Sequence, residues 1–516
     1  MAPTRIACAV LLTRGSGEAL EVFLAKRAPE LSFFGGYLAF LGGVVDEADH
    51  DGEADVLPAL FRCAWRELFE EAGVLPAGLS ALIPEMERVA LRARLMARDE
   101  QASLAAGEFR EYLDRCPELS APDSAAAPQV IGRLTTPPFA PVLYRTLFVR
   151  IELPAGQEAS VMQGELVQGS FVQPSKAMQG WLAGELCIVP PAVYFLSELA
   201  RFEESQAWER LAQACRACSA GKLHEIRTVP GIWMIPLATE TIPPATTTNA
   251  YWVGSESAYL IDPASFDPAE QARLFDFVDE RLAQGLKLAG VIATHHHHDH
   301  IGAIVPVAKR YGVPVLAHRE TLDRLDLDGC ETRELRDADE LYLGPPVDAA
   351  GRPGEPGAEP WSLRAYHTPG HDRGHLVLLE NGCNAALVGD LCSTVSTIVI
   401  DPPEGHMGTY LKSLERMLQV PMGVLHPAHG PVHPDGHTLL RAYLEHRKQR
   451  EQRLLAQLQA QPLELAELAR SVYDDVLPAL MPLALRSLLA GLHKLRDEGL
   501  ALEDEGAWRL SMEPPA

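Results

Sequence analysis

Residues that can bind metal ions are concentrated at positions 294–300, where the chain reads Thr-His-His-His-His-Asp-His. The run follows an apolar segment, 288–293, that has the pattern of a buried strand. Two imidazoles at i and i+2, then a carboxylate and an imidazole at i+4 and i+5, can converge if the chain turns sharply after that strand. Neutral imidazole and carboxylate are the ligands that suit zinc. A tag or a low-complexity run is the alternative, but tags stand at chain ends and this run lies mid-chain.

Four further polar motifs stand at the ends of expected strands or after glycine-rich loops. They are Asp262 after the strand 259–261, His-Thr-Pro-Gly-His at 367–371, Leu-Val-Gly-Asp at 387–390 and Pro-Ala-His-Gly at 427–430. Together with the histidine run, and in this order, these motifs resemble those of the metallo-β-lactamase fold superfamily. The resemblance spans roughly residues 225–440 and implies an αβ/βα sandwich.

The resemblance also implies a dinuclear metal centre that binds two zinc ions, or iron or manganese. One ion would be held by three imidazoles and the other by a carboxylate and two imidazoles, with a bridging carboxylate between them: His295, His297 and His371; Asp299, His300 and His429; and Asp390. Asp299 would in addition take part in catalysis.

Other polar residues of the motifs are expected to act indirectly. Asp262 resembles a buried acid that orients the histidine loop. His296 and His298 fall at variable positions and are not expected to bind metal. His367 and His375 are expected to contact either the ligands or the substrate.

The residue at the bridging position narrows the chemistry. The main zinc class of true β-lactamases carries a cysteine there, whereas Asp390 resembles the branch with thioesterases such as glyoxalase II and with RNA phosphodiesterases, so a β-lactam substrate is not expected. Two divalent ions lower the pKa of a shared water from about 16 to near 7 and polarise the carbonyl or phosphoryl oxygen under attack. No serine or cysteine nucleophile is then required.

A second group of acids lies near the N-terminus, on an expected helix over 59–72. Glu67, Glu70 and Glu71 stand at i, i+3 and i+4 on the side opposite its apolar stripe. Three glutamates alone are typical of a solvated acidic helix face. The preceding Leu-Gly-Gly-Val-Val-Asp at 41–46, however, makes the region resemble a Nudix box with an insertion between its halves.

This resemblance covers most of residues 4–200, and the interrupted box is similar to that of the branch with a coenzyme A diphosphatase. It implies Mg²⁺ or Mn²⁺ held by Glu67, Glu70 and Glu71, with Glu67 as ligand or general base. The box's first glutamate falls on Asp49 when counted from Gly43, and on Pro58 when counted back from Arg66. The alternative is a fold kept as a structural or binding module.

The C-terminal region has the order of a winged helix. A long, partly basic helix is expected over 441–461, then a short helix over 463–472, a leucine-striped helix over 485–495 and a hairpin over 500–510. This order resembles a metallo-β-lactamase subfamily that includes a mitochondrial endoribonuclease. Because the wing is acidic at 503–505, packing or a substrate lid is favoured over sequence-specific nucleic-acid binding.

Composition sets the remaining limits. A chain of 516 residues suggests about three domains, and the segments above predict a multidomain α/β protein: a Nudix α/β/α sandwich over 1–222, the metallo-β-lactamase sandwich over 223–440, and a linker helix with a winged helix over 441–516. Nine scattered cysteines and no long apolar run favour a cytoplasmic protein that does not contact a membrane. A net charge of −25 argues against extended nucleic-acid binding.

The motifs together predict a bifunctional metal-dependent hydrolase. Its small-molecule substrate would be a thioester such as acyl-coenzyme A, with the Nudix domain acting on a nucleoside-diphosphate-linked compound such as coenzyme A. The alternatives are an endoribonuclease or phosphodiesterase that cuts RNA and uses the Nudix fold for binding, and a sensor without turnover. The Pro/Gly-rich segment 344–360 is expected to be a surface loop or a substrate lid.

Overall fold

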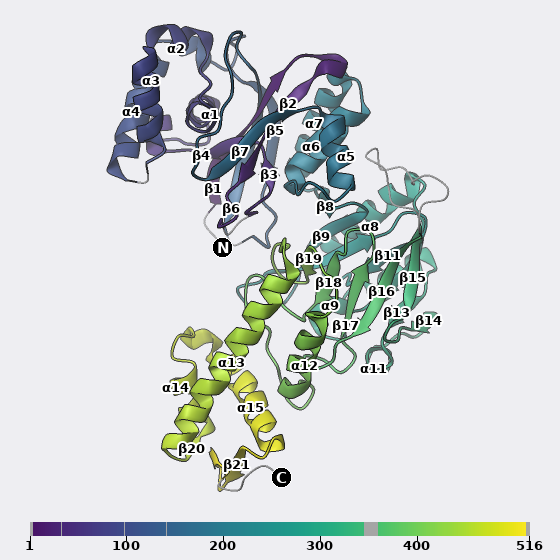
Figure 1. Cartoon of the computed structure of the whole chain (residues 1–516). Coiled ribbons are helices and arrows are strands. Elements are labelled where there is room, and N and C mark those ends of the chain that lie inside the picture. Colours follow the sequence, from purple (N-terminus) through teal and green to yellow (C-terminus); the bar gives the residue numbers. More distant parts are fainter. Residues whose placement is uncertain (1–3, 32–33, 98, 141, 345–359, 512–516) are drawn as a thin grey trace. The chain divides into compact units, whose positions relative to one another are not determined.

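The computed structural model describes residues 4–31, 34–97, 99–140, 142–344 and 360–511 (Figure 1). The chain divides into two compact units, the first ending at Pro230 and the second beginning at Gly231. Within the described residues, no helix has both the length and the apolar character needed to cross a bilayer. Residues 345–359 of the expected surface loop lie outside the described residues.

The first unit is built on a mixed sheet with the strand order β3-β2-β1-β6-β5, in which β4 also pairs with β1 and β7 with β2. The strands are β1 (Thr4–Arg14), β2 (Glu21–Arg27), β3 (Leu38–Ala39), β4 (Leu41–Val44), β5 (Gln129–Thr135), β6 (Leu143–Glu152) and β7 (Leu166–Val172). Alternate residues of β1 enter two separate hydrophobic clusters. Val10 and Leu12 belong to one cluster, and Leu11 belongs to the other. Both faces of the sheet are therefore covered.

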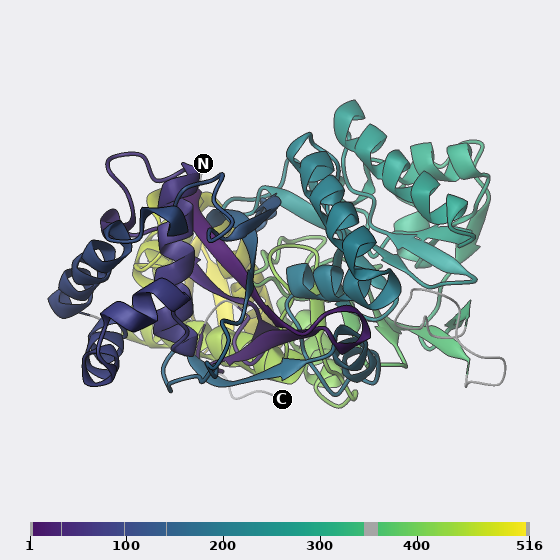
Figure 2. The ribbon, with the colours of Figure 1, turned by 90° about the horizontal axis from the view of Figure 1, so that it is seen from above.

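Helices form the two outer layers of this unit, as Figures 1 and 2 show. One group shares the cluster of Val10: α1 (Leu57–Ala72), α2 (Ala77–Leu82), α3 (Glu85–Leu95) and α4 (Glu100–Asp114). The other shares the cluster of Leu11: α5 (Pro174–Leu182), α6 (Pro190–Arg201) and α7 (Glu204–Ser219), after which comes β8 (Ile226–Val229). The unit is a three-layer α/β/α sandwich.

The second unit contains two sheets. The first runs β14-β13-β12-β11-β10-β9 and the second β15-β16-β17-β18-β19. The strands of the first are β9 (Ile232–Ala238), β10 (Thr247–Val253), β11 (Ala258–Ile261), β12 (Leu288–Ile292), β13 (Val315–Ala317) and β14 (Thr332–Glu334). Those of the second are β15 (Glu340–Gly344), β16 (Trp361–His367), β17 (Leu376–Glu380), β18 (Ala386–Gly389) and β19 (Leu425–Pro427).

The two sheets meet through polar contacts and carry helices on their other sides. Asn249 and Tyr251 of β10 donate hydrogen bonds of 3.0 and 2.7 Å to the carbonyl of Pro427 in β19. Helices α8 (Pro268–Ala283) and α10 (Ile304–Tyr311) contact the first sheet. Helix α12 (Met407–Met417) packs on the second. Two short helices, α9 (His298–Ile301) and α11 (Arg319–Leu322), follow β12 and β13 of the first sheet.

The apolar periodicity after the histidine run predicts one helix over 301–311, and the structure differs from that prediction. A turn, α9, ends at Ile301, and the long helix α10 begins only at Ile304. The break arises because the N–H groups of Gly302 and Ala303 donate to the carbonyls of Ala264 and Pro263. A Cβ at Gly302 would stand 2.4 Å from the backbone of Ser265, so the close approach requires glycine.

The C-terminal part of the second unit contains α13 (Gly436–Ala460), β20 (Leu463–Glu464), α14 (Leu465–Val472), α15 (Met481–Asp497), β21 (Ala501–Asp504) and β22 (Ala507–Leu510). The expected hairpin is present, and β22 also pairs with β20. Helix α13 begins at Gly436 rather than at the expected 441, because Asp435 caps it by accepting from the N–H of Thr438. The buried Trp508 joins wing and helices in one hydrophobic cluster.

Candidate metal centre

The predicted metal ligands of the second unit all follow strands. His295 and His297 lie in the loop after β12, while Asp299 and His300 lie in α9. The other three follow β16, β18 and β19: His371, Asp390 and His429. Because these strands end at one edge of the sandwich, residues up to 134 positions apart come together.

Asp390 lies between two groups of side chains. Its Oδ2 is 3.5 Å from Nε2 of His371, whereas its Oδ1 is 3.6 Å from Nε2 of His300 and 3.3 Å from Nε2 of His429. Asp299 completes the second side, with Oδ2 3.5 Å from His429 Nε2. The two carboxylate oxygens of Asp390 thus face different groups, as a bridging residue requires.

The potential ligand atoms fall into overlapping sets whose members lie within 4.8 Å of one another: His295, His297 and His371; His295, His300 and Asp390; and Asp299, His300 and His429. A further set with the same spacing contains His296, which is not expected from the sequence to bind metal, together with His297 and Asp372. Two ligand atoms that bind one tetrahedral zinc at about 2.0–2.1 Å are about 3.3 Å apart. The separations around Asp390 are close to that value and too long for good hydrogen bonds.

Several of these atoms are buried and lack hydrogen bonds. Nε2 of His295, His300 and His371 and Oδ1 of Asp390 have no hydrogen-bond partner among the described residues. Leaving four such atoms unpaired in one place is costly for a folded chain. A pair of divalent cations would satisfy all of them, and the residues present therefore fit the metal ions that the fold implies.

The opposite ring nitrogens are fixed by the protein. Nδ1 of His371 donates to the carbonyl of Val399 (2.9 Å), and Nδ1 of His429 donates to that of Thr247 (3.0 Å). Nδ1 of His300 donates to Asp262 (2.9 Å). In a neutral ring a donating Nδ1 leaves the free lone pair on Nε2, and each Nε2 points towards Asp390. Burial opposes a charged His300, but Asp390, Asp299 and Asp262 outweigh it and raise the pKa of His300 well above its usual value, so a metal ion would have to displace the Nε2 proton of that ring.

Asp262 holds the histidine loop in place through hydrogen bonds. Its carboxylate accepts from the backbone N–H of Thr294 (2.8 Å), from the Thr294 hydroxyl (2.6 Å) and from His300. The Thr294 oxygen in turn lies 3.0 Å from Nδ1 of His295. One buried acid therefore orients two of the imidazoles.

Burial and neighbouring charges set the protonation of the centre. Burial and the surrounding imidazoles lower the pKa of His295 well below its usual value, and burial and His371 lower that of His297 to about 3. Burial disfavours a charged Asp390, but His429 and the other nearby imidazoles outweigh it and hold its pKa well below the usual range. Neutral imidazole and ionised carboxylate are the forms that bind metal.

The remaining histidines of the motifs have other contacts. His375 is fully buried; its Nε2 accepts from the backbone N–H of Asp390 (3.1 Å), and its Nδ1 donates to Thr368 (2.8 Å). It therefore holds the bridging residue rather than the substrate. Nε2 of His367 donates to the carbonyl of Arg373 (2.8 Å), and the ring stacks on His318.

His296 and His298 lie outside the sets around Asp390. His296 contacts the buried carboxylate of Asp372, a pair that the sequence did not suggest. The ring of His298 stacks on that of Phe266, with centroids 4.2 Å apart and planes 11° apart. Phe266 is 51% exposed, so this aromatic pair is open to a ligand.

A cavity of about 620 Å³ opens beside the centre. Its lining includes His298, Asp299, Phe266, Asp267 and Glu240. Its lining residues include three acids and no lysine or arginine. The volume is in the range of small-molecule sites.

The glutamates of the first unit are arranged around Arg66. Its Nη2 lies 2.8 Å from Oδ2 of Asp49, and its Nη1 lies 2.8 Å from Glu67 and 3.4 Å from Glu70. Of the two positions offered by counting, Asp49 is therefore the one placed against the arginine. Pro58 instead lies in the first turn of α1.

The three glutamates do not converge as the histidines do. Oε2 of Glu71 accepts from the N–H of Gly42 (2.7 Å), and Gly43 packs directly against the carboxylate of Glu67. In the described part of the chain, no set of potential ligand atoms within 4.8 Å includes them. Burial and the Glu67 charge raise the pKa of Glu70 to about 8, and the same causes raise that of Glu71 well above its usual value.

Comparison with known proteins places two families on the second unit. Residues 243–429 match the metallo-beta-lactamase superfamily, and residues 465–508 match the beta-lactamase associated winged helix domain. The chain carries a metallo-β-lactamase domain followed by a winged-helix domain. The first match includes every histidine and aspartate of the centre, so this domain is a hydrolase of the metallo-β-lactamase fold.

Relatives are similar over about half of the chain or less. A beta-lactamase-like protein 2 homolog of Drosophila melanogaster is 29% identical over 263 residues, which cover 49% of this chain and 83% of the relative. An atrochrysone carboxyl ACP thioesterase of Paecilomyces divaricatus is 30% identical over 41% of this chain and 59% of that protein. A solved NUDIX hydrolase from Alicyclobacillus acidocaldarius has a TM-score of 0.32 and 24% identity, covering 40% of this chain and 97% of that one.

Proposed function

We propose that the metallo-β-lactamase domain is a thioesterase with a dinuclear metal centre. The observation that carries the proposal is the position of Asp390, whose two carboxylate oxygens face two separate sets of ligand atoms. One set is His295, His297 and His371, and the other is Asp299, His300 and His429. When bound, two divalent ions supply hydroxide at neutral pH and polarise the carbonyl under attack.

The chain's own residues divide the remaining work. His295 and His297 stay neutral because of burial, and His375 holds the backbone of Asp390 in place. Asp299 faces both the centre and the cavity. It is therefore the carboxylate best placed to take a proton from the attacking water. The Phe266–His298 pair would hold an uncharged part of the substrate beside it.

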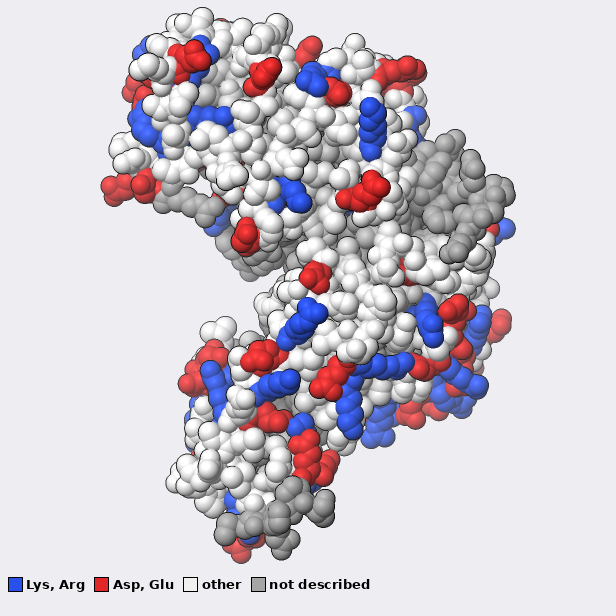
Figure 3. Space-filling model, viewed as in Figure 1, with Lys and Arg blue, Asp and Glu red and all other residues white. Residues whose placement is uncertain are grey.

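Beside the centre, charge favours the uncharged acyl part of a thioester over the charged phosphodiester of RNA. The cavity beside the centre is lined by Glu240, Asp267 and Asp299, which would repel a phosphodiester backbone. On the face shown in Figure 3, the described lysines and arginines of the C-terminal region are interspersed with acids. On α15, Arg486 pairs with Asp401, and Lys494 pairs with two glutamates. The relative that is a thioesterase also supports this choice.

A substrate panel tests the proposal. Zinc-loaded protein is mixed with acyl-coenzyme A, lactoylglutathione and short single-stranded RNA, and release of thiol or RNA fragments is followed. We expect thioester cleavage that falls at least about 100-fold in Asp390→Ala and is unchanged in Asp328→Ala, an exposed carboxylate. Cleavage of RNA but of neither thioester would refute the thioesterase proposal and support the endoribonuclease alternative.

For the first unit we propose a Nudix-like hydrolase that acts on a diphosphate such as that of coenzyme A. The support is the α/β/α sandwich, the Asp49–Arg66–Glu67 network, and the raised pKa of Glu70, which burial and the Glu67 charge raise although Arg66 lies 3.4 Å away. Mg²⁺ or Mn²⁺ would bind at Glu67, Glu70 and Glu71. Glu67 would serve as ligand or general base.

This second activity is tested with coenzyme A and Mg²⁺ or Mn²⁺. Hydrolysis adds one water across the diphosphate and gives two phosphomonoesters, which chromatography separates. We expect products from the wild type and from Asp390→Ala, but none from Glu70→Gln/Glu71→Gln. If coenzyme A binds without being cut, the unit is a binding module instead.

A further inference from the structure

The connection between β18 and α12, residues 390–406, contains no helix or strand. Much of it is nevertheless buried, including Ser393, Ile398 and Ile400. Buried backbone groups need hydrogen-bond partners, and a segment without its own ladder must find them elsewhere. Between Ser393 and Pro402 most of the partners come from the C-terminal helices α13 and α15.

Helix α13 holds the first part of the connection. The hydroxyl of Tyr443 accepts from the N–H of Ser393 (2.8 Å) and lies 2.6 Å from the carbonyl of Ser396. One turn further along, Nη2 of Arg447 donates to the carbonyl of Ile398. Both side chains are 6% exposed, so these contacts are made away from water.

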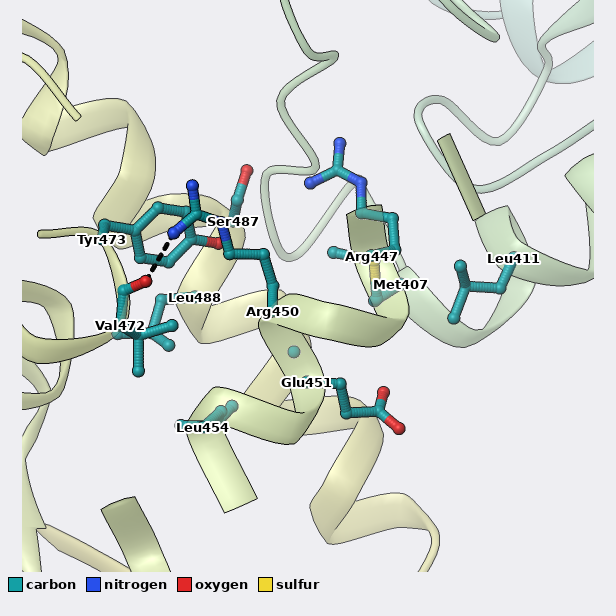
Figure 4. A pocket seen from close by; sticks show the side chains of 11 residues that line it. Met407, Leu411, Arg447, Arg450, Glu451, Leu454, Val472, Tyr473, Ser487 and Leu488 are labelled. Carbon is teal, nitrogen blue, oxygen red and sulfur yellow. Dashed lines mark hydrogen bonds between the residues drawn. The ribbon is translucent and has the colours of Figure 1, made fainter. Parts of the chain in front are cut away.

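Helix α15 of the winged helix holds the next part. The hydroxyl of Ser487 accepts from the N–H of Ile400 (3.2 Å), and the guanidinium of Arg486 binds Asp401 and the carbonyl of Pro402. A cavity of about 30 Å³ lies where α12, α13, α14 and α15 meet. Figure 4 shows Arg447 and Ser487 extending from their two helices towards the same side of it.

Between these two anchored residues lies Val399. Its carbonyl accepts from Nδ1 of His371 (2.9 Å) and so sets both the tautomer and the rotation of that ring. Ile398 is held by α13 and Ile400 by α15. The residue of the connection that accepts from the ring of His371 is thus fixed on both sides by the C-terminal helices.

We infer that Arg447 and Ser487 are positioning residues for the metal centre: through residues 398–400 they hold His371 in the orientation in which it binds metal. The inference rests on the dinuclear centre of the proposed function. It gives the winged helix a role in the hydrolase that requires no nucleic acid. The two helices α13 and α15 would fix His371 in the same way whatever substrate enters the cavity beside Asp299.

Replacing Ser487 by alanine would remove the acceptor of Ile400 and leave a buried N–H without a partner. The peptide at 399–400 would then rotate or take up water, and the carbonyl of Val399 would no longer be held towards His371. Loss of a direct partner of a metal ligand costs about 10–100-fold in affinity. Because Ser487 acts one residue away, we expect zinc affinity to fall about 3–10-fold at one of the two sites.

The test measures metal binding in the full chain, without substrate. Zinc affinity is measured by competition with a chromophoric chelator, and Co²⁺ absorption spectra report the ligand geometry. The control is Ser471→Ala in α14, because that hydroxyl donates only to the carbonyl of Leu468 in its own helix. Ser487→Thr keeps the hydroxyl and should restore both affinity and spectrum.

The expected result is weaker binding of one ion and an altered Co²⁺ spectrum in Ser487→Ala and Arg447→Met, with wild-type behaviour in the control and in Ser487→Thr. Unchanged affinity and spectrum in both variants would overturn the inference. A chain that binds two ions normally but cleaves no thioester would refute the proposed function and leave this inference to be decided by the same titrations.

Discussion

Asp262 provides the sharpest perturbation of the centre that leaves every proposed ligand in place. In Asp262→Asn the amide oxygen can still accept from the N–H of Thr294. The amide NH₂ would then face the Thr294 hydroxyl and Nδ1–H of His300, which are both donors. His300 would have to move its proton to Nε2, the atom that points to Asp390.

The magnitude follows from these contacts. Asp262 is 2% exposed, and the variant loses two hydrogen bonds to a carboxylate, each worth about 1.5–3 kcal/mol. We therefore expect the metal-free chain to lose about 3–6 kcal/mol of stability. Zinc affinity should fall about 10–100-fold, which is about 1.4–2.8 kcal/mol.

Two assays separate these effects. Urea unfolding in the presence of a chelator gives the stability of the metal-free chain, and chelator competition gives the zinc affinity. Glu270→Gln is a matched control, because Glu270 is also a buried acid that accepts a backbone N–H, from Ala238, but lies outside the centre. If Asp262→Asn kept zinc affinity within twofold of the wild type, the orienting role of Asp262 would be refuted.

Three further predictions concern other parts of the chain. Gly302→Ala forces a Cβ against the backbone of Ser265 and should lower the free energy of unfolding in urea by about 1–3 kcal/mol. The control Gly107→Ala places its Cβ in open space on α4 and should raise that free energy by up to about 1 kcal/mol. Equal effects of the two variants would contradict the close approach of Gly302 to Ser265. The pKa of Glu70 is raised to about 8, so between about pH 4.5 and 8 the folded chain keeps a proton that the unfolded chain has released. The stability that this proton contributes is complete below about pH 4.5 and is lost as the pH rises to about 8. Glu70→Gln should therefore reduce the dependence of the melting temperature on pH, measured with a chelator present, and an unchanged dependence would contradict the raised pKa. Phe266→Ala removes half of the stacked pair and should raise the KM for a thioester several-fold with little change in kcat, whereas a loss confined to kcat would place the residue outside the substrate site.

Much of the centre could be predicted from the sequence because its side chains lie in short motifs at strand ends. The histidine run, Asp390 and His429 each follow an apolar segment, and such segments are readable as strands. The partners of these residues could not be predicted in the same way. The carbonyls of Val399 and Thr247 belong to the backbone, so no residue type marks them as acceptors.

The misplaced helix starts have local causes that only the fold reveals. The start of α10 depends on the loop at 263–264, which takes the N–H groups of Gly302 and Ala303. The start of α13 depends on the Asp435 cap, which precedes the expected helix by several residues. Asp49 is similar: it is the acidic one of the two positions reached by counting, but only the fold shows that it lies beside Arg66.

The central claim is that Asp390 bridges two metal ions that act together on a thioester. Its most direct test is a titration of metal-free protein with Zn²⁺, in which bound metal and the rate of thioester cleavage are measured at each step. We predict that activity rises until two ions are bound per chain and that Asp390→Ala binds fewer and gains no activity. Full activity with one ion per chain, or an active Asp390→Ala variant, would contradict it.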